Sequence, residues 1–124
     1  MPNSRRDYKL YFLDIASSCK KISSYIRGLT FEKFSSEPKT IDAVVRNLEI
    51  IGEAVNKVPL EIKKETSEIP WNEIVGLRNK VTHEYFDVNI PIIWETVKDD
   101  IPNLQRQVNN VLKELSSNQL KLTS

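Results

Sequence analysis

The stretch RRDYKLYFLDIASSCKKISSYIR, from Arg5 to Arg27, places an apolar residue at every third or fourth position. This spacing matches the 3.6-residue period of an α-helix, so one side of the helix would be apolar and the other polar. The apolar positions are Tyr8, Phe12, Ile15, Cys19, Ile22 and Ile26. Gly28 follows the last of them and can take the left-handed conformation that ends many helices. The sequence therefore predicts a long amphipathic helix over residues 5–27.

The same spacing predicts three further long helices. One begins near Pro38 and ends before Pro59, with an apolar stripe of Ile41, Val44, Leu48, Ile51, Val55 and Val58. Another begins at Pro70 and Trp71 and runs to about Tyr85, with Trp71, Ile74, Val75 and Val81 on its buried side. The last is capped by Asn89 and carries Ile93, Val97, Ile101, Leu104, Val108, Val111 and Leu115. Pro102 lacks a backbone N–H, so we expect a kink or interruption near Asp99.

Between these helices, residues 29–38 are predicted to form a connection whose Phe31 and Phe34 pack onto the body, and residues 59–66 a short helical turn. No segment alternates apolar and polar residues as a strand would. The predicted fold class is all-α, an up-and-down bundle of about four to five helices. The 124 residues fit one domain, which we place at residues 1–115, with residues 116–124 as a frayed C-terminal tail.

Charge and composition limit the possible functions. Eighteen basic and seventeen acidic side chains give a net charge of +1, so nucleic-acid binding would have to be local. A single cysteine, Cys19, excludes an intrachain disulfide, and a single histidine excludes a multi-histidine metal site in one chain. No apolar run resembles a signal peptide or a membrane span. We expect a cytoplasmic protein without a metal, a cofactor or a membrane contact.

The segment GLRNKVTHEYFD, Gly76 to Asp87, contains this only histidine. On a helix Asn79 and His83 would lie on one line, with Arg78 about 100° to one side. A guanidinium fits phosphate oxygens, an imidazole can carry a proton near neutral pH, and an asparagine can orient either group. These groups suit cleavage of a phosphodiester by its neighbouring 2′-hydroxyl. Equally, an arginine and a histidine on an amphipathic helix are often only solvated surface residues.

The number of histidines bears on the oligomeric state. Such cleavage needs a base for the hydroxyl proton and an acid for the leaving oxygen, and one chain supplies a single imidazole. A two-fold dimer would supply His83 twice and Arg78 twice. If the chain is an enzyme, the sequence favours an active homodimer.

Three phrases, LEIIGEAVNK, IPWNEIVGLRNKVTHEYFDV and IIWETV, resemble the HEPN superfamily in their order and spacing. Within it the chain is similar to the HepT-like ribonuclease toxins of HepT/MntA-type toxin–antitoxin pairs, over nearly its whole length. The resemblance implies a dimeric helical bundle that cleaves RNA without metal, with Arg78 and His83 catalytic and Asn79 supporting. It also implies a nucleotidyltransferase antitoxin that transfers AMP to the motif tyrosine, here Tyr85. This describes the toxin of a type VII system.

Some residues have two interpretations. Glu53 either orients Arg78 across helices or pairs with Lys57 four residues on. Trp71 and Trp94 are predicted to make core or dimer contacts rather than to stack on bases. Gly52 indicates close helix packing, and Cys19 an inert core position.

As an alternative function, the chain could be a non-catalytic nucleotide-binding or docking subunit of a nucleotidyltransferase, which needs Arg78 but no proton-carrying His83.

Overall fold

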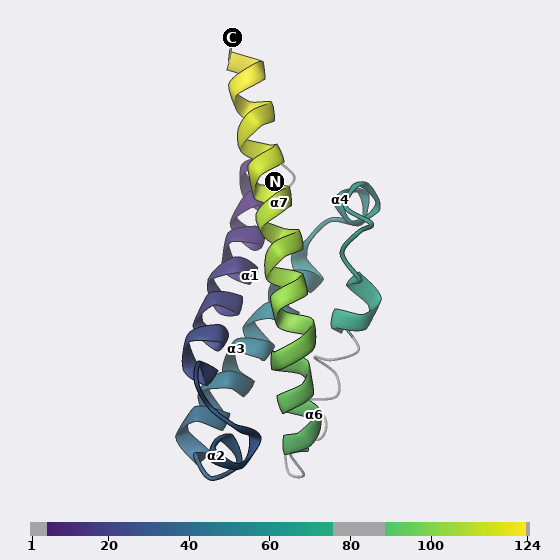
Figure 1. Ribbon diagram of the computed structural model, residues 1–124. Helices are drawn as coiled ribbons and strands as arrows, with labels where there is room; N and C mark the ends of the chain where they lie inside the picture. Colours follow the sequence, from purple (N-terminus) through teal and green to yellow (C-terminus); the bar gives the residue numbers. More distant parts are fainter. Residues whose placement is uncertain (1–4, 76–88, 124) are drawn as a thin grey trace.

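A computed structural model describes residues 5–75 and 89–123, and this part of the chain is helical without strands (Figure 1). Three long helices form the bundle: α1 (Arg5–Ile26), α3 (Pro38–Lys57) and α7 (Ile101–Thr123). Shorter helical segments are α2 (Phe31–Ser35), α4 (Leu60–Glu65), α6 (Ile90–Glu95), the π-helical η2 (Thr96–Asp100) and residues 71–75. Helix α1 packs against both α3 and α7. The predicted all-α bundle is confirmed, with more short helices than predicted.

Helix α1 buries the apolar stripe predicted for it. Phe12, Ile15, Cys19 and Ile22 are fully inaccessible to solvent, and they lie on the side that meets α3 and α7. Burial raises the pKa of the Cys19 thiol to about 12, so this cysteine is an inert core residue as predicted. Gly28 has a φ of 76°, the left-handed conformation expected after the last turn.

The connection after α1 contains one feature that the sequence analysis missed, the short helix α2. Its N-cap is Thr30, whose hydroxyl accepts a hydrogen bond from the backbone N–H of Lys33 at 3.1 Å. Phe34 is fully buried with its ring 5.0 Å from that of Trp94, as predicted for a residue that packs onto the body. Phe31 packs less well, because 39% of its surface stays exposed.

Helix α3 begins at Pro38 and ends at Lys57, in agreement with the prediction. All six residues of its predicted stripe are buried, as is Gly52. Val58 follows in an extended conformation, which suits a residue that precedes a proline. Because α1 and α3 bury complementary stripes, their contact forms the main part of the core.

The C-terminal helical run starts where it was predicted. The side chain of Asn89 accepts a hydrogen bond from the N–H of Ile92 at 3.2 Å and so caps α6. The α-helical pattern then changes to the π-helical η2 over Thr96–Asp100, just before Pro102. A proline cannot donate to the carbonyl four residues earlier, which explains the interruption expected near Asp99.

Helix α7 runs through to Thr123, so it includes most of the residues predicted to be a frayed tail. No helix in residues 5–75 or 89–123 is long and apolar enough to span a membrane.

Candidate functional site

The four polar motif residues predicted to act together, Arg78, Asn79, His83 and Tyr85, fall within residues 76–88, outside the described part of the chain. The same holds for Val81 and for the predicted end of that helix. What the structure does describe is how the chain enters and leaves this segment, and what surrounds those two points.

The chain enters the motif segment from helical residues 71–75, which begin where predicted. Trp71 anchors this point, because its indole Nε1 donates to the Thr66 carbonyl at 3.1 Å and its ring meets the ring of Phe12 edge-on at 5.9 Å. The ammonium group of Lys63 lies 5.8 Å from the same ring. Ile74 is buried one turn later. The residues before the motif are therefore held on the bundle core.

The chain leaves the motif segment at Asn89, the cap of α6. Ile93 is buried in the core, and Trp94 packs against Phe34. Both tryptophans thus make the core contacts predicted for them. Residues 76–88 are joined at each end to helical residues fixed by core packing.

Glu53, the predicted supporting residue, lies on the exposed side of α3. Lys57 is also exposed, and within the described residues no ion pair joins the two side chains. The described residues thus do not contain the Glu53–Lys57 pair, which was one of the two interpretations of Glu53. The other interpretation, that Glu53 orients Arg78, stays a prediction.

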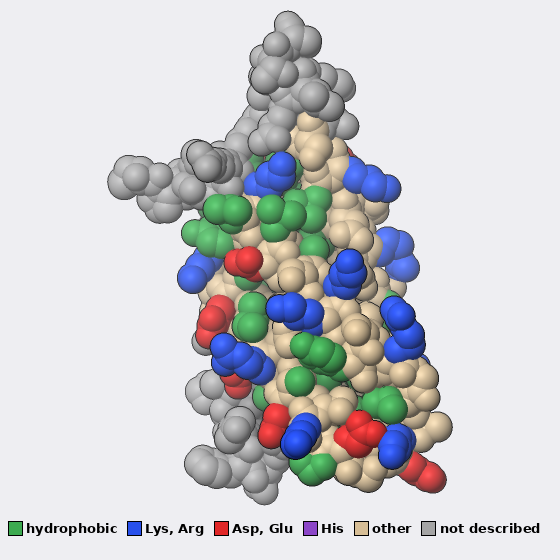
Figure 2. Space-filling model, turned by 90° about the vertical axis from the view of Figure 1, so that its left-hand side faces the viewer, with side chains coloured by type: hydrophobic (Ala, Val, Ile, Leu, Met, Phe, Trp, Pro, Cys, Tyr) green, Lys and Arg blue, Asp and Glu red, His purple; other side chains and the backbone are tan. Residues whose placement is uncertain are grey.

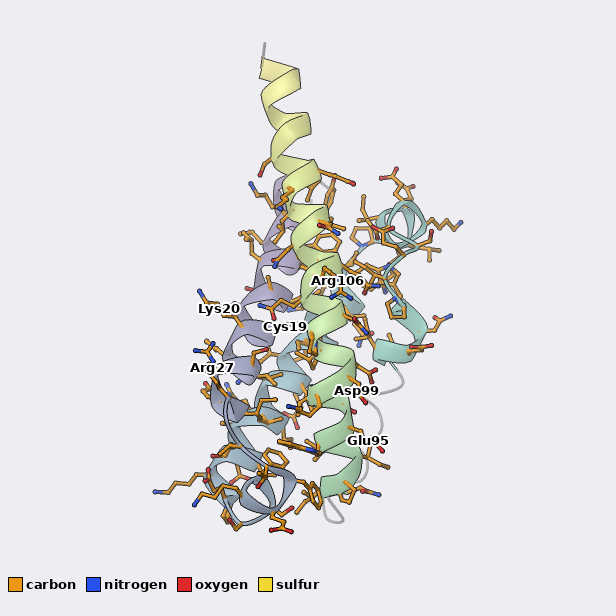
Figure 3. All side chains as sticks on the ribbon, viewed as in Figure 1. Cys19, Lys20, Arg27, Glu95, Asp99 and Arg106 are labelled. Atoms are coloured by element: carbon orange, nitrogen blue, oxygen red, sulfur yellow. The ribbon has the colours of Figure 1, made fainter. Side chains whose placement is uncertain are left out.

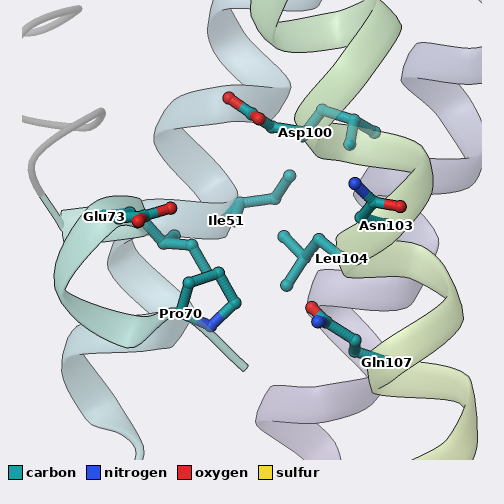
Figure 4. Close-up of a pocket in the computed structure, with 9 residues that line it drawn as sticks. Ile51, Pro70, Glu73, Asp100, Asn103, Leu104 and Gln107 are labelled. Atoms are coloured by element: carbon teal, nitrogen blue, oxygen red, sulfur yellow. The ribbon is translucent and has the colours of Figure 1, made fainter. Parts of the chain in front are cut away.

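A cavity of about 180 Å³ lies beside the entry to the motif segment (Figure 4). Its wall consists of Ile51 from α3, Pro70, Glu73 and Ile74 before the motif, and Asp100, Ile101, Asn103, Leu104 and Gln107 from η2 and α7. Among the residues that the structure describes, no basic side chain lines it. Burial raises the pKa of Asp100, and the negative charges of Asp99, Glu73 and Glu95 raise it further. The described wall of this cavity is therefore acidic.

Sequence reasoning missed this cavity because its wall comes from three segments that are far apart in the sequence. The only local signal was the pair of acidic residues just before Pro102, which the sequence analysis used solely to locate a kink.

A shallower groove of about 630 Å³ lies at the exit from the motif segment, between α3 and the start of α6. Of its described lining residues Arg46 alone is basic, and the two carboxylates of Asp42 and Glu49 outweigh that charge. Within residues 5–75 and 89–123, no group of three or more histidine, cysteine, aspartate or glutamate side chains is placed to hold a metal ion.

Comparison with known proteins defines the class. The family model described as Ribonuclease HepT-like matches residues 15–111. A protein of Caldanaerobacter subterraneus subsp. tengcongensis named "Putative RNase" is 44% identical over 104 residues, which cover 84% of this chain and 93% of that protein. The "Probable ribonuclease HepT" of Thermococcus cleftensis is 41% identical over 109 residues, which cover 88% of this chain and 99% of that protein. No solved structure matches significantly.

The chain belongs to the HepT-like ribonuclease family. The family and enzyme class predicted from the sequence are therefore confirmed. The match spans Arg78, His83 and Tyr85 as well as Glu53 on α3.

Proposed function

We propose that the chain is a metal-independent endoribonuclease that cuts RNA at a composite site in a homodimer, with Arg78 and His83 as catalytic residues. Asn79 and Glu53 support them. The observation that carries the proposal is the family match over residues 15–111, a range that includes the whole motif. The anchored residues on each side of the motif agree with a site that must hold its groups in fixed positions.

The proposed reaction uses the RNA's own 2′-hydroxyl. One His83 imidazole removes the hydroxyl proton, and the oxygen attacks the adjacent phosphorus. The bond from phosphorus to the 5′-oxygen breaks, and the His83 imidazolium of the second copy protonates that oxygen. The products are a 2′,3′-cyclic phosphate and a 5′-hydroxyl, so atoms and charge balance without a metal. Arg78 stabilises the extra negative charge on the phosphate oxygens.

The proposed biological setting is a type VII toxin–antitoxin system in the cytoplasm. A cognate nucleotidyltransferase antitoxin would transfer AMP from ATP to the phenol of Tyr85 and release pyrophosphate. The added phosphate would compete with RNA for Arg78, while the nucleoside would occupy space beside His83. A Tyr85→Phe variant should keep most of its RNA cleavage and gain no AMP mass when incubated with the antitoxin and ATP. An equal mass gain on wild type and variant would place the acceptor elsewhere.

Cleavage of a labelled RNA in the presence of EDTA tests the catalytic roles. His83→Ala should fold normally and lose about 100-fold or more in rate, the usual contribution of a general acid or base. Arg78→Lys should also lose activity, because an ammonium does not reproduce the two-pronged contact of a guanidinium. Arg106→Lys on the exposed face of α7 is the matched control and should cleave like wild type. Wild-type rates for His83→Ala would reject the catalytic proposal and favour the docking-subunit alternative.

Light scattering tests the composite site. A dimer mass is expected for the active protein at micromolar concentration. An active monomer would contradict the shared use of His83, because a single chain holds one imidazole.

A further inference from the structure

The C-terminal half of α1 carries a concentrated positive charge. Residues 17–27 contain Lys20, Lys21 and Arg27 and no acidic residue, although the whole chain is nearly neutral. All three side chains are exposed. Figure 2 views the molecule from the side on which α1 lies in Figure 1, and lysine and arginine side chains are spread over much of this face, with aspartate and glutamate side chains among them.

These three cations are not used by the fold. Among the described residues none of them makes an ion pair or a side-chain hydrogen bond. Figure 3 shows Lys20 and Arg27 on the outer side of α1, away from α7. Seven residues at 1.5 Å each separate the two positions by about 10 Å along the helix axis. The group therefore forms an elongated basic surface rather than a single point.

An aromatic ring lies within this basic surface. Tyr25 follows Lys21 by one helical turn, so the two side chains are neighbours on the surface of α1. Tyr25 keeps 39% of its surface exposed, whereas Phe12 and Ile15 on the core side are fully buried. Exposed aromatic rings between basic side chains are the arrangement that binds single-stranded nucleic acids, with the cations on phosphates and the ring on a base.

The rest of the charge distribution favours this side over the opposite one. Figure 3 shows Glu95 and Asp99 across the molecule from Lys20 and Arg27. The acidic cavity, with Glu73 and Asp100 in its wall, lies near Glu95 and Asp99. The carboxylates of the cavity repel a polyanion, whereas residues 17–27 present cations without a carboxylate among them. The family assignment makes RNA the polyanion that the protein handles.

We propose that Lys20, Lys21 and Tyr25 on α1, together with Arg27 just after its last residue, form an accessory binding surface for single-stranded RNA, which contacts the substrate away from the scissile bond. The inference rests on the proposed function for its substrate. It assigns the three cations to phosphates and Tyr25 to a stacked base. The surface adds affinity for longer RNA and takes no part in the chemical step.

Salt-dependent binding tests the surface without cleavage. The probe is a fluorescent 2′-O-methyl RNA of about 20 nucleotides, which lacks the attacking hydroxyl. For single strands, each phosphate contact contributes about −0.7 to the slope of log K against log salt concentration. The Lys20→Gln/Lys21→Gln double variant should therefore make this slope shallower by about 1.4. Lys64→Gln, an exposed lysine of α4, is the control and should leave the slope unchanged.

The aromatic part has its own variants. Tyr25→Ala should bind the same probe about tenfold more weakly, because it removes the stacking ring, and Tyr25→Phe should restore binding. Circular dichroism at matched concentration checks that each variant is folded. A double lysine variant with the slope of Lys64→Gln, or a Tyr25→Ala variant with wild-type affinity, would overturn the proposal.

Kinetics separate this inference from the catalytic proposal. On a long cleavable RNA, the double lysine variant should raise KM with little change in kcat, whereas His83→Ala should lower kcat and leave binding of the 2′-O-methyl probe intact. If the protein binds the probe through α1 but cuts no RNA, the accessory surface stands and the catalytic proposal fails. If the protein cuts RNA but the double lysine variant binds the probe like wild type, the catalytic proposal stands and the accessory surface fails.

Discussion

Replacement of Trp71 by phenylalanine tests whether this residue fixes the entry to the motif segment. The change removes the hydrogen bond from indole Nε1 to the Thr66 carbonyl, which is worth about 1 kcal/mol. That carbonyl still accepts from the N–H of Ile69 at 3.0 Å, so it is not left unpaired. Trp71 is only 8% exposed, so the smaller phenylalanine ring also loses core packing. We expect this loss to lower the stability by about another 1 kcal/mol, well below the ~3–5 kcal/mol of a complete truncation to alanine.

The assay is thermal unfolding followed by circular dichroism. At about 2.1 cal/mol/K per residue, the 124 residues have an unfolding entropy of about 260 cal/mol/K. A loss of about 2 kcal/mol therefore lowers Tm by about 8 °C. Wild type and variant must be compared at one protein concentration, because a dimer unfolds in a concentration-dependent way.

The matched control is Trp94→Phe. Trp94 is only half-buried, and its indole N–H has no hydrogen bond within the described residues. We expect its replacement to cost about 1 kcal/mol or less, which is about 4 °C. If Trp71→Phe lowered Tm no more than Trp94→Phe, the anchoring role of the Trp71 hydrogen bond would be wrong.

Three other changes have defined outcomes. Gly28→Ala should cost about 1 kcal/mol in chemical denaturation from its φ of 76° alone, because within the described part of the chain no atom beyond its two sequence neighbours lies within 4 Å of the added methyl group. Asn89→Ala should cost about 1 kcal/mol by removing the bond to the Ile92 N–H, and Asn89→Asp should restore it. Burial and three neighbouring carboxylates raise the pKa of Asp100, so its ionised form opposes folding. Asp100→Asn should therefore be more stable than wild type at pH 7, an advantage lost as pH falls and Asp100 is protonated in both folded and unfolded protein.

The long helices were predictable because each buries one stripe, and burial of such a stripe leaves a regular trace in the sequence. All six stripe residues of α3 are buried, and Pro102 marks the π-helical interruption before it. Helix α2 was missed because five residues are too short to show a period. Its determinant is a single side chain, the Thr30 cap, within a segment rich in turn formers.

The site residues were predicted from a short contiguous motif and not from a periodic pattern. The motif at Arg78 and His83 is contiguous in sequence, so its chemistry could be proposed from residue types. Because that chemistry uses two imidazoles and the chain has one histidine, the sequence also predicted a dimer. The acidic cavity had no such trace, since Glu73 and Asp100 are 27 residues apart and meet only where the residues before the motif lie against η2 and the start of α7. The basic surface of α1 was hidden for another reason. A net charge of +1 sums over the whole chain, so it conceals a local group of cations such as Lys20, Lys21 and Arg27, which has no carboxylate within residues 17–27. Net charge therefore excluded a uniform field here, but it could not exclude a local basic surface, and a local surface is all that the proposed accessory RNA contact requires.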